Sequence, residues 1–132
     1  MITSKNNPLI KRFRSFKNNF PVKESGLFCI EGTHLLEEFL SLKINPSKII
    51  ATQAWLLKNN NLIDNLDLEI ISEVSKDALR SAVSTKNPDG VAALVPKSAL
   101  KEFTFEKEDE FILVLDRIQD PGNLGNLFRT AL

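Results

Sequence analysis

The residues best placed to do chemistry lie in a glycine-bearing stretch close to the end of the printed sequence. Residues 111–115 form a continuous apolar run of strand length, rich in β-branched and aromatic side chains. Residues 116–125 have the composition of a tight loop, and apolar residues follow at helical spacing, with Arg129 among them. This order predicts a strand, a loop at its carboxyl end and a helix. Ligands bind at that position in open α/β sheets, so the loop is a candidate site.

The same stretch also has a simpler interpretation, an ordinary turn between two core elements. Asp-Pro-Gly-Asn at 120–123 is a common turn composition, and Arg129 would then be a solvated helix residue. The segment GNLGNLF lacks the third glycine of GxGxxG and the Gly-Lys-Ser/Thr of a P-loop. Spacing alone therefore does not identify a phosphate-binding loop.

The full order of these residues is more specific than its parts. The pattern DxIQDPGNLGxxxRTA, from Asp116 to Ala131, resembles the first conserved motif of the SpoU (TrmH-like) RNA ribose 2′-O-methyltransferases, members of the knotted SPOUT superfamily. Enzymes of that family transfer a methyl group from S-adenosylmethionine to a ribose 2′-hydroxyl of ribosomal or transfer RNA. The resemblance places the motif asparagine, glycine and arginine on Asn123, Gly125 and Arg129.

Two earlier segments resemble the substrate-binding domain of the same family. FCIEGTHLL at 28–36 is similar to its FxxEGxHL signature, and VSTKNPDGV at 83–91 is similar to its closing segment. The opening residues 2–11 are also typical, and the resemblance is weakest over 53–67 and 97–110. It implies an L30e/L7Ae-like α/β sandwich that grips RNA, followed by the first βα unit of a knotted methyltransferase domain.

The resemblance implies that Arg129 and Asn123 are the catalytic residues. Methyl transfer is an in-line displacement at a sulfonium methyl, so a catalyst must align the 2′-hydroxyl and help its proton leave. A guanidinium, with a pKa above about 12, is a poor general base. We therefore expect Arg129 to position the substrate and stabilise charge through its planar fork, with proton abstraction as the alternative. Asn123 would hold Arg129 or the ribose.

No residue of this chain is expected to bind S-adenosylmethionine. The second and third motifs of the family build the knot, the cofactor site and most of the dimer interface, and we expect them beyond Leu132. The last helix shows no stop signal, so we expect the chain to be cut within a domain. The fragment should bind RNA weakly and be inactive alone, whereas the full-length enzyme should use S-adenosylmethionine and form a homodimer.

Charge is unevenly distributed along the chain, although 17 basic and 17 acidic residues balance overall. Residues 1–23 contain six basic residues and no acid, so the remaining 11 basic and 17 acidic residues leave the rest of the chain negative. A basic N-terminal helix predicts contact with a polyanion, and a solvated helix face is the alternative. The candidate RNA-binding residues there are Lys5, Lys11, Arg12, Arg14 and Lys17.

Four other residues are candidates with simpler alternatives. Glu31 would orient RNA or serve as a structural anion at a helix start, and His34 would contact RNA or be an ordinary surface histidine. Lys86 lies in a predicted turn where it would reach a phosphate or remain solvated. Trp55 is more often a core residue than a platform for base stacking.

Composition limits the remaining possibilities. A chain of 132 residues with 42% hydrophobic content supports one sizeable core, or one domain plus a fragment. Cys29 is a single cysteine in an apolar run, which favours a buried, inert thiol, and no Cys/His cluster has metal-ligand spacing. Neither a membrane span nor a signal peptide is evident, so we expect a soluble cytoplasmic protein.

The elements that must position these residues alternate along the chain. Patterning predicts strands at 27–31, 48–51, 68–71 and 91–95, helices at 8–18 and 75–83, and helices after 32 and 52. Ser75 is the predicted N-cap, and Leu35, Leu36, Phe39 and Leu40 the core stripe of the second helix. The predicted division is a basic arm (1–23), an RNA-binding domain (24–96), a linker (97–110) and an incomplete methyltransferase domain (111–132).

Two functions from different classes follow. The first is an RNA ribose 2′-O-methyltransferase acting on ribosomal or transfer RNA, of which this chain is a portion. The alternative is a non-catalytic L7Ae-like RNA-binding module, for which residues 1–95 would suffice. Residues 111–132 discriminate between them, because a binding module has no need of an Asn-x-Gly-x-x-x-Arg segment.

Overall fold

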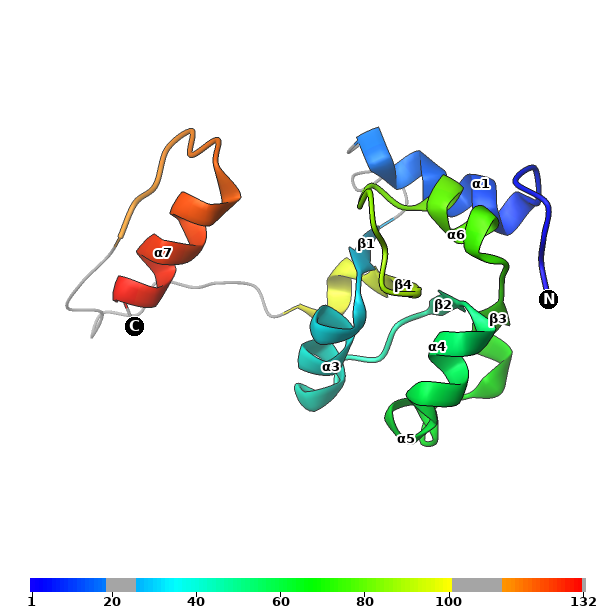
Figure 1. Ribbon diagram of the computed structural model, residues 1–132. Coiled ribbons are helices and arrows are strands. Elements are labelled where there is room, and N and C mark those ends of the chain that lie inside the picture. The colour runs from blue at the N-terminus through cyan, green and yellow to red at the C-terminus, as the bar shows by residue number, and fades with distance from the viewer. Residues whose placement is uncertain (19–25, 101–112, 132) are drawn as a thin grey trace. The chain divides into compact units, whose positions relative to one another are not determined.

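The computed structural model describes residues 1–18, 26–100 and 113–131. By internal contacts the chain divides into two compact units, Met1–Lys101 and Glu102–Leu132. The first unit contains a sheet with helices on both faces, and the second contains a single helix among its described residues (Figure 1). Most of the predicted linker 97–110 lies outside the described residues.

The first unit is built on a four-stranded mixed sheet in the order β1-β4-β2-β3. β4 is antiparallel to both β1 and β2, and β2 is parallel to β3. The first three strands therefore run in one direction, and their carboxyl ends meet at the same edge of the sheet. The bounds are β1 (Leu27–Glu31), β2 (Lys48–Ala51), β3 (Ile71–Glu73) and β4 (Val91–Pro96).

Helices cover the sheet on both faces, as the alternating pattern predicts (Figure 1). One hydrophobic cluster joins the sheet to α1 (Pro8–Ser15) and α6 (Lys76–Ala82). The other joins it to α3 (Thr33–Ser41), α4 (Gln53–Lys58) and α5 (Asn60–Ile63). The α/β class of this unit is thus confirmed.

β4 is the centre of the core because it is buried on both faces. Its first five residues are each no more than 1% exposed. Ala92 and Leu94 pack toward α1 and α6, whereas Val91, Ala93 and Val95 pack toward α3 and α4, since side chains alternate along a strand. This explains why the segment has a continuous apolar run rather than an alternating pattern.

Local capping explains where several helices begin. The Asn7 side chain accepts from Leu9 N at 2.9 Å, with Pro8 in the first turn, and a short 3₁₀ helix (Phe16–Asn18) continues α1. The predicted cap Ser75 is confirmed, because its Oγ accepts from Ala78 N at 3.2 Å. α1 contributes to the core of the first unit through Ile10 and Phe13, both fully buried.

Two predictions about this unit are wrong in detail. Residues 68–70 form a 3₁₀ helix (Leu68–Ile70) instead of a strand, because the Asp67 side chain accepts from Glu69 N at 2.9 Å and caps a helical turn. The strand begins only at Ile71. Leu35 is 42% exposed, so α3 buries a narrower stripe centred on Leu36 than its sequence suggests.

The second unit differs more from its prediction. Residues 113–115 are irregular instead of a strand, while 111 and 112 lie outside the described residues. A strand needs a neighbour for its backbone hydrogen bonds, and Val114 is 81% exposed with no such neighbour in the described residues. 3₁₀ helix η3 (Lys97–Ala99) precedes the undescribed segment.

The helix of the second unit begins earlier than predicted. α7 spans Pro121–Ala131, so Asn123 and Gly125 are helical and residues 120–123 are not a free turn. Asp120 explains the early start, because its Oδ1 accepts from Asn123 N at 2.7 Å and Pro121 occupies the first helical position. In the described part of the chain, no helix is long and apolar enough to cross a membrane.

Candidate functional site

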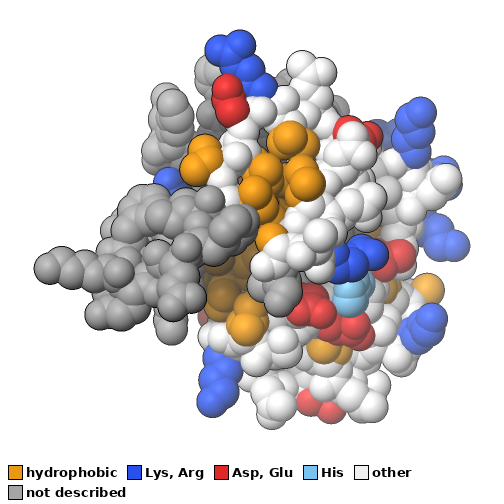
Figure 2. Space-filling model, turned by 90° about the vertical axis from the view of Figure 1, so that its left-hand side faces the viewer, with side chains coloured by type: hydrophobic (Ala, Val, Ile, Leu, Met, Phe, Trp, Pro, Cys, Tyr) orange, Lys and Arg blue, Asp and Glu red, His pale blue; other side chains and the backbone are white. Residues whose placement is uncertain are grey.

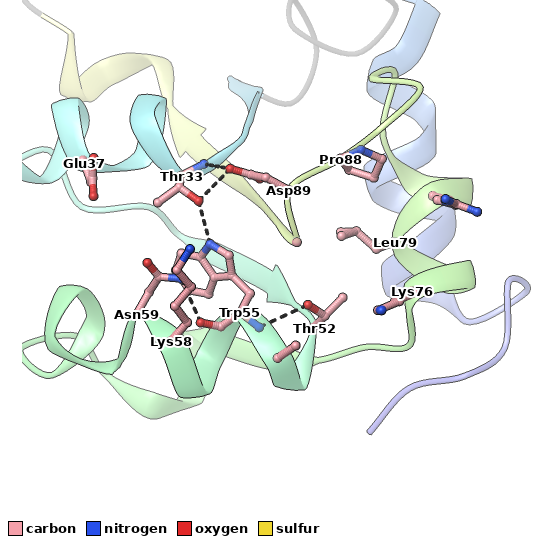
Figure 3. A pocket seen from close by; sticks show the side chains of 13 residues that line it. Thr33, Glu37, Thr52, Trp55, Lys58, Asn59, Lys76, Leu79, Pro88 and Asp89 are labelled. Carbon is pink, nitrogen blue, oxygen red and sulfur yellow. Dashed lines mark hydrogen bonds between the residues drawn. The ribbon is translucent and has the colours of Figure 1, made fainter.

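A cleft of about 740 Å³ opens at the edge of the sheet where β1, β2 and β3 end. Its lining comes from the residues that follow each of these strands and from the segment that precedes β4. Figure 3 shows it between α4 on one side and α6 on the other. The lining includes Thr33, Thr52, Trp55, Leu79, Asp89 and Gly90.

A chain of hydrogen bonds fixes one wall of the cleft (Figure 3). Asp89 Oδ2 accepts from the Thr33 backbone N at 2.8 Å and from Thr33 Oγ1 at 2.7 Å. Thr33 Oγ1 in turn accepts from the Trp55 indole Nε1 at 2.7 Å. These contacts connect the start of α3, α4 and the segment before β4, so the wall is held in one arrangement.

Gly90 allows the segment before β4 to approach α4. Its φ of +121° is rarely adopted by other residues, and a Cβ at this position would lie 2.8 Å from Trp55 Cβ and 3.0 Å from Thr52 Oγ1. Gly90 O also accepts from Thr52 N at 2.9 Å. A side chain at 90 would push the walls of the cleft apart.

The cleft is lined by charged side chains of both signs. Lys58, Lys76 and Arg80 contribute three positive charges, and Glu37 and Asp89 contribute two negative ones. All three cations are exposed, and within the described residues none of them forms an ion pair within 4.0 Å. They are therefore available to an anionic group that enters the cleft.

Glu31 organises a smaller hollow of about 120 Å³ beside the cleft. Its carboxylate accepts from Ser84 N at 2.7 Å, Thr85 N at 2.8 Å and Thr85 Oγ1 at 2.6 Å. Partial burial raises the pKa of Glu31, but the hydrogen bonds from Ser84 and Thr85 outweigh it and leave the pKa below its ordinary value. The carboxylate is thus ionised and committed to its own chain.

Asn123 and Arg129 both lie exposed on α7. They are six positions apart in the sequence, which corresponds to about 9 Å along a helix axis. Within the described residues no hydrogen bond joins the two side chains, and Asn123 contributes its backbone N–H to the cap at Asp120. The helix therefore presents two separate polar groups and not a preformed pair.

Residues 7–93 match the family described as the MRM3-like substrate binding domain, which covers more than half of the chain. The chain belongs to this family. These are the substrate-binding domains of SpoU (TrmH-like) RNA 2′-O-methyltransferases, so the resemblance in the sequence is confirmed.

Relatives and solved structures agree with this assignment. The chain is 38% identical to an uncharacterized tRNA/rRNA methyltransferase of Synechocystis and 32% identical to the 23S rRNA (guanosine(2553)-2′-O)-methyltransferase RlmP of Bacillus subtilis. Each alignment covers 98% of this chain, but only 48% and 49% of those proteins. The chain thus spans about half the length of the curated relatives it matches.

A crystal structure of an RNA 2′-O ribose methyltransferase aligns with 98% of the chain and with 50% of its own length, at a TM-score of 0.75 and 28% identity. An AdoMet-bound rRNA methyltransferase from Sinorhizobium meliloti aligns with 73% of this chain and 36% of its own, at a TM-score of 0.58. With 18% identity, the second likeness shows the shared fold alone.

Only some of the basic side chains predicted to bind RNA are available for binding in the MRM3-like domain. Lys5, Lys11 and Arg12 are exposed. Arg14 was predicted to point outward, but its guanidinium donates to Ser81 O, Ser81 Oγ and Lys5 O at 2.8–2.9 Å and ties α1 to α6. Lys17 Nζ lies 3.5 Å from Arg80 O. On the face drawn in Figure 2, the coloured basic side chains are scattered among acidic and uncharged ones.

The other candidates have different surroundings in the structure. The His34 side chain is 86% exposed and its Nδ1 lies 4.0 Å from Glu37. Lys86 is exposed between Thr85 and Asn87, which line the smaller hollow. Trp55 is 4% exposed, as its core interpretation predicts, although it also lines the cleft.

Cys29 is half-buried, and burial, followed by the nearby Glu31 carboxylate, raises the pKa of its thiol to about 12. The thiol is therefore protonated at neutral pH and a poor nucleophile. This agrees with the inert role predicted for it. Among the described residues, no group of three or more His, Cys, Asp and Glu side chains could hold a metal ion.

Sequence reasoning did not single out the cations that line the cleft, Lys58, Lys76 and Arg80. Lys76 and Arg80 follow the predicted cap Ser75 on the helix after β3, and Lys58 ends the helix that follows β2. The convergence of parallel strand ends was the available signal. It requires knowledge of strand order, which the sequence pattern alone does not supply.

Proposed function

We propose that this chain is the RNA-binding part of an S-adenosylmethionine-dependent RNA (ribose-2′-O)-methyltransferase that acts on ribosomal or transfer RNA. In this proposal Met1–Lys101 is an L30e/L7Ae-like α/β sandwich that holds the RNA, and residues 111–132 begin the catalytic domain. The observation that carries the proposal is the family match over 7–93, supported by the alignment with a solved RNA 2′-O ribose methyltransferase.

Arg129 and Asn123 are the proposed catalytic residues. Their support is the motif DxIQDPGNLGxxxRTA, in which the resemblance places the family's asparagine and arginine on these two positions, and both side chains are exposed on α7. A guanidinium held against the ribose and its flanking phosphate would align the 2′-hydroxyl and stabilise charge as its proton leaves. Asn123 stands about 9 Å from Arg129 along the helix, which is too far for it to hold the guanidinium. Asn123 would therefore donate to or accept from the ribose.

The methyl donor is proposed to bind to residues other than those described here. The cleft and the smaller hollow beside it both lie in the first unit, and their linings include charged and polar side chains that suit RNA. The described part of the second unit presents a single exposed helix. When bound, S-adenosylmethionine would supply the methyl group, and the residues of this chain would bind the RNA that accepts it.

The proposal is tested by methyl transfer. The protein is expressed from its whole reading frame and supplied with tritiated-methyl S-adenosylmethionine and total RNA from its own cells. We expect label at ribose 2′-oxygens, and a loss of about 100-fold or more in rate for Arg129→Ala, the usual cost of removing one group that stabilises developing charge. Arg117→Ala is the matched control, because the Arg117 side chain is 90% exposed in the same unit.

The outcomes are distinct. Full activity in Arg129→Ala would remove Arg129 from the chemistry. Absence of methyl transfer to any RNA, with RNA binding intact, would reject the enzyme and favour the alternative, a non-catalytic L7Ae-like RNA-binding module. That alternative draws on one observation, the compactness of Met1–Lys101 with its own core.

A further inference from the structure

We propose that the cleft between α4 and α6 holds one unpaired nucleotide of the RNA, with its phosphate against the basic side chains of α6. The inference rests on the proposed function and deepens it, because it names the part of the RNA that the first unit grips. It makes the cleft a recognition site for a single-stranded or flipped nucleotide, separate from the methyl-accepting chemistry.

The topology favours this location. Three strands end at one edge of the sheet, and the cleft is lined by residues that follow each of them, such as Thr33 after β1, Thr52 after β2 and Lys76 after β3. In open α/β sheets this edge is where ligands bind, because backbone and side-chain polar groups from several loops converge there. The hydrogen bonds through Thr33 hold the convergence in place before any ligand arrives.

The size of the cleft also fits. At about 740 Å³ it falls within the range of about 300–1,000 Å³ that small-molecule sites occupy. A duplex could not enter it, whereas one nucleotide could. Unpaired bases are the usual targets of RNA recognition, because their edges and faces are accessible.

The distribution of charge orients the nucleotide. Lys76 and Arg80 are four residues apart on α6, a spacing that places two residues on one face of a helix, and both line the cleft. Neither is paired with an acid within the described residues, and together an ammonium and a guanidinium fork match the oxygens of a phosphodiester.

The remainder of the lining suits a base more than further phosphates. Glu37 and Asp89 place carboxylates on the cleft, which would repel a polyphosphate but accept hydrogen bonds from base amino groups. Pro88 and the buried Trp55 add apolar surface. A single phosphodiester with its attached base therefore fits the lining better than a nucleoside triphosphate.

Trp55 makes the cleft observable, because it is the only tryptophan in the chain. Its indole N–H gives a single resonance in an amide-detected NMR spectrum, and that N–H is donated to Thr33 Oγ1 at 2.7 Å. A nucleotide that enters the cleft must alter the surroundings of this group. RNA bound elsewhere on the chain leaves it unchanged.

The test titrates an unstructured single-stranded RNA oligonucleotide into the 132-residue chain, with anisotropy for affinity and the indole resonance for location. Lys76→Gln combined with Arg80→Gln is compared with Lys43→Gln combined with Lys97→Gln, exposed lysines that do not line the cleft. Both double variants lose two positive charges. Circular dichroism checks that each is folded, and Lys58→Gln on α4 serves as a second cleft variant.

We expect the cleft variant to bind RNA about tenfold more weakly and the control to bind within about twofold of the unmodified chain. The salt slope of log K should shrink by roughly 0.7 to 1.4 in the cleft variant alone, which corresponds to one or two phosphate contacts on a single strand. The indole resonance should shift on binding. Lys58→Gln should also bind more weakly than the unmodified chain.

Three results would overturn the inference. Equal weakening of both double variants, or a stationary indole resonance at saturating RNA, would place the RNA elsewhere and leave the proposed function standing. Free cytidine or uridine monophosphate that binds as tightly as the oligonucleotide would make the cleft a site for small nucleotides and not for an RNA strand. Absence of any RNA binding by the unmodified chain would overturn both the inference and the proposed function.

Discussion

Glu31 joins two stretches of sequence that lie more than 50 residues apart. It ends β1, and its carboxylate accepts hydrogen bonds from the backbone of Ser84 and Thr85. Both stretches carry the family resemblance, the first in FCIEGTHLL and the second in VSTKNPDGV. Their shared physical basis is this clamp, which positions the segment that leads through Asp89 and Gly90 into β4.

The clamp predicts a pH-dependent loss of stability in Glu31→Gln. Because hydrogen bonds lower the folded-state pKa of Glu31 from 4.5, the ionised carboxylate stabilises the fold above that pH. The contribution is lost as the pH falls below 4.5 through the lowered folded-state pKa. Near neutral pH we expect Glu31→Gln to cost about 1 kcal/mol, a value reduced for the solvent exposure of the group. Denaturant unfolding of the variant and the unmodified chain, at neutral pH and well below pH 4.5, measures this cost.

Glu38→Gln on α3 is the control, since Glu38 is exposed and its side chain forms no hydrogen bond or ion pair within the described residues. Its unfolding free energy should track the unmodified chain at both pH values. A destabilisation of Glu31→Gln that is equally large well below pH 4.5 would contradict the assignment to ionisation.

The residue before β4 and the start of α4 pack closely against each other. Thr52 caps α4 and donates its N–H to Gly90 O, while Trp55 packs on Gly90. No side chain at 90 fits between them, because the nearest atoms lie 2.8 and 3.0 Å from a Cβ at that position. The close approach is therefore a property of two elements and not of the glycine alone.

Gly90→Ala should destabilise the first unit by about 3 kcal/mol or more, through backbone strain at positive φ together with the steric conflict. Gly26→Ala isolates the first effect, since its φ is +62° and nothing lies within 4 Å of a Cβ there. It should cost about 1–2 kcal/mol. Thermal or denaturant unfolding measures both. Equal costs for the two variants would show that the contact with α4 is irrelevant.

Periodicity identified the elements that the core buries and missed those that local capping decides. The apolar run 91–95 is a strand because both faces of β4 are covered, and Ser75 caps α6 as its type predicts. Asp67 and Asp120 also cap helical turns, whereas the sequence pattern predicts a strand from residue 68 and a turn at 120–123. Capping of a helical turn depends on a single side-chain contact. Hydrophobic periodicity, which is judged over many residues, does not register the contribution of one residue.

At the scale of the molecule, the sequence indicated the family and an α/β unit, but not the cleft. Lys58 ends α4, which follows β2, whereas Lys76 and Arg80 lie on α6, which follows β3, and only the sheet order β1-β4-β2-β3 brings these cations to one edge. Conversely, Arg14 lies in the basic N-terminal segment, but its guanidinium donates to Ser81 and so connects α1 to α6. Charge along a sequence does not reveal which side chains remain free after folding.

Salt-dependent RNA binding by the 132-residue chain shows whether the chain holds RNA. Binding to ribosomal RNA fragments is measured over a range of salt concentrations, with circular dichroism to confirm the fold. We expect weak binding whose log K falls linearly with log salt, by about 0.7 for each single-strand phosphate contacted. A folded chain that binds no RNA even at low salt would contradict this expectation.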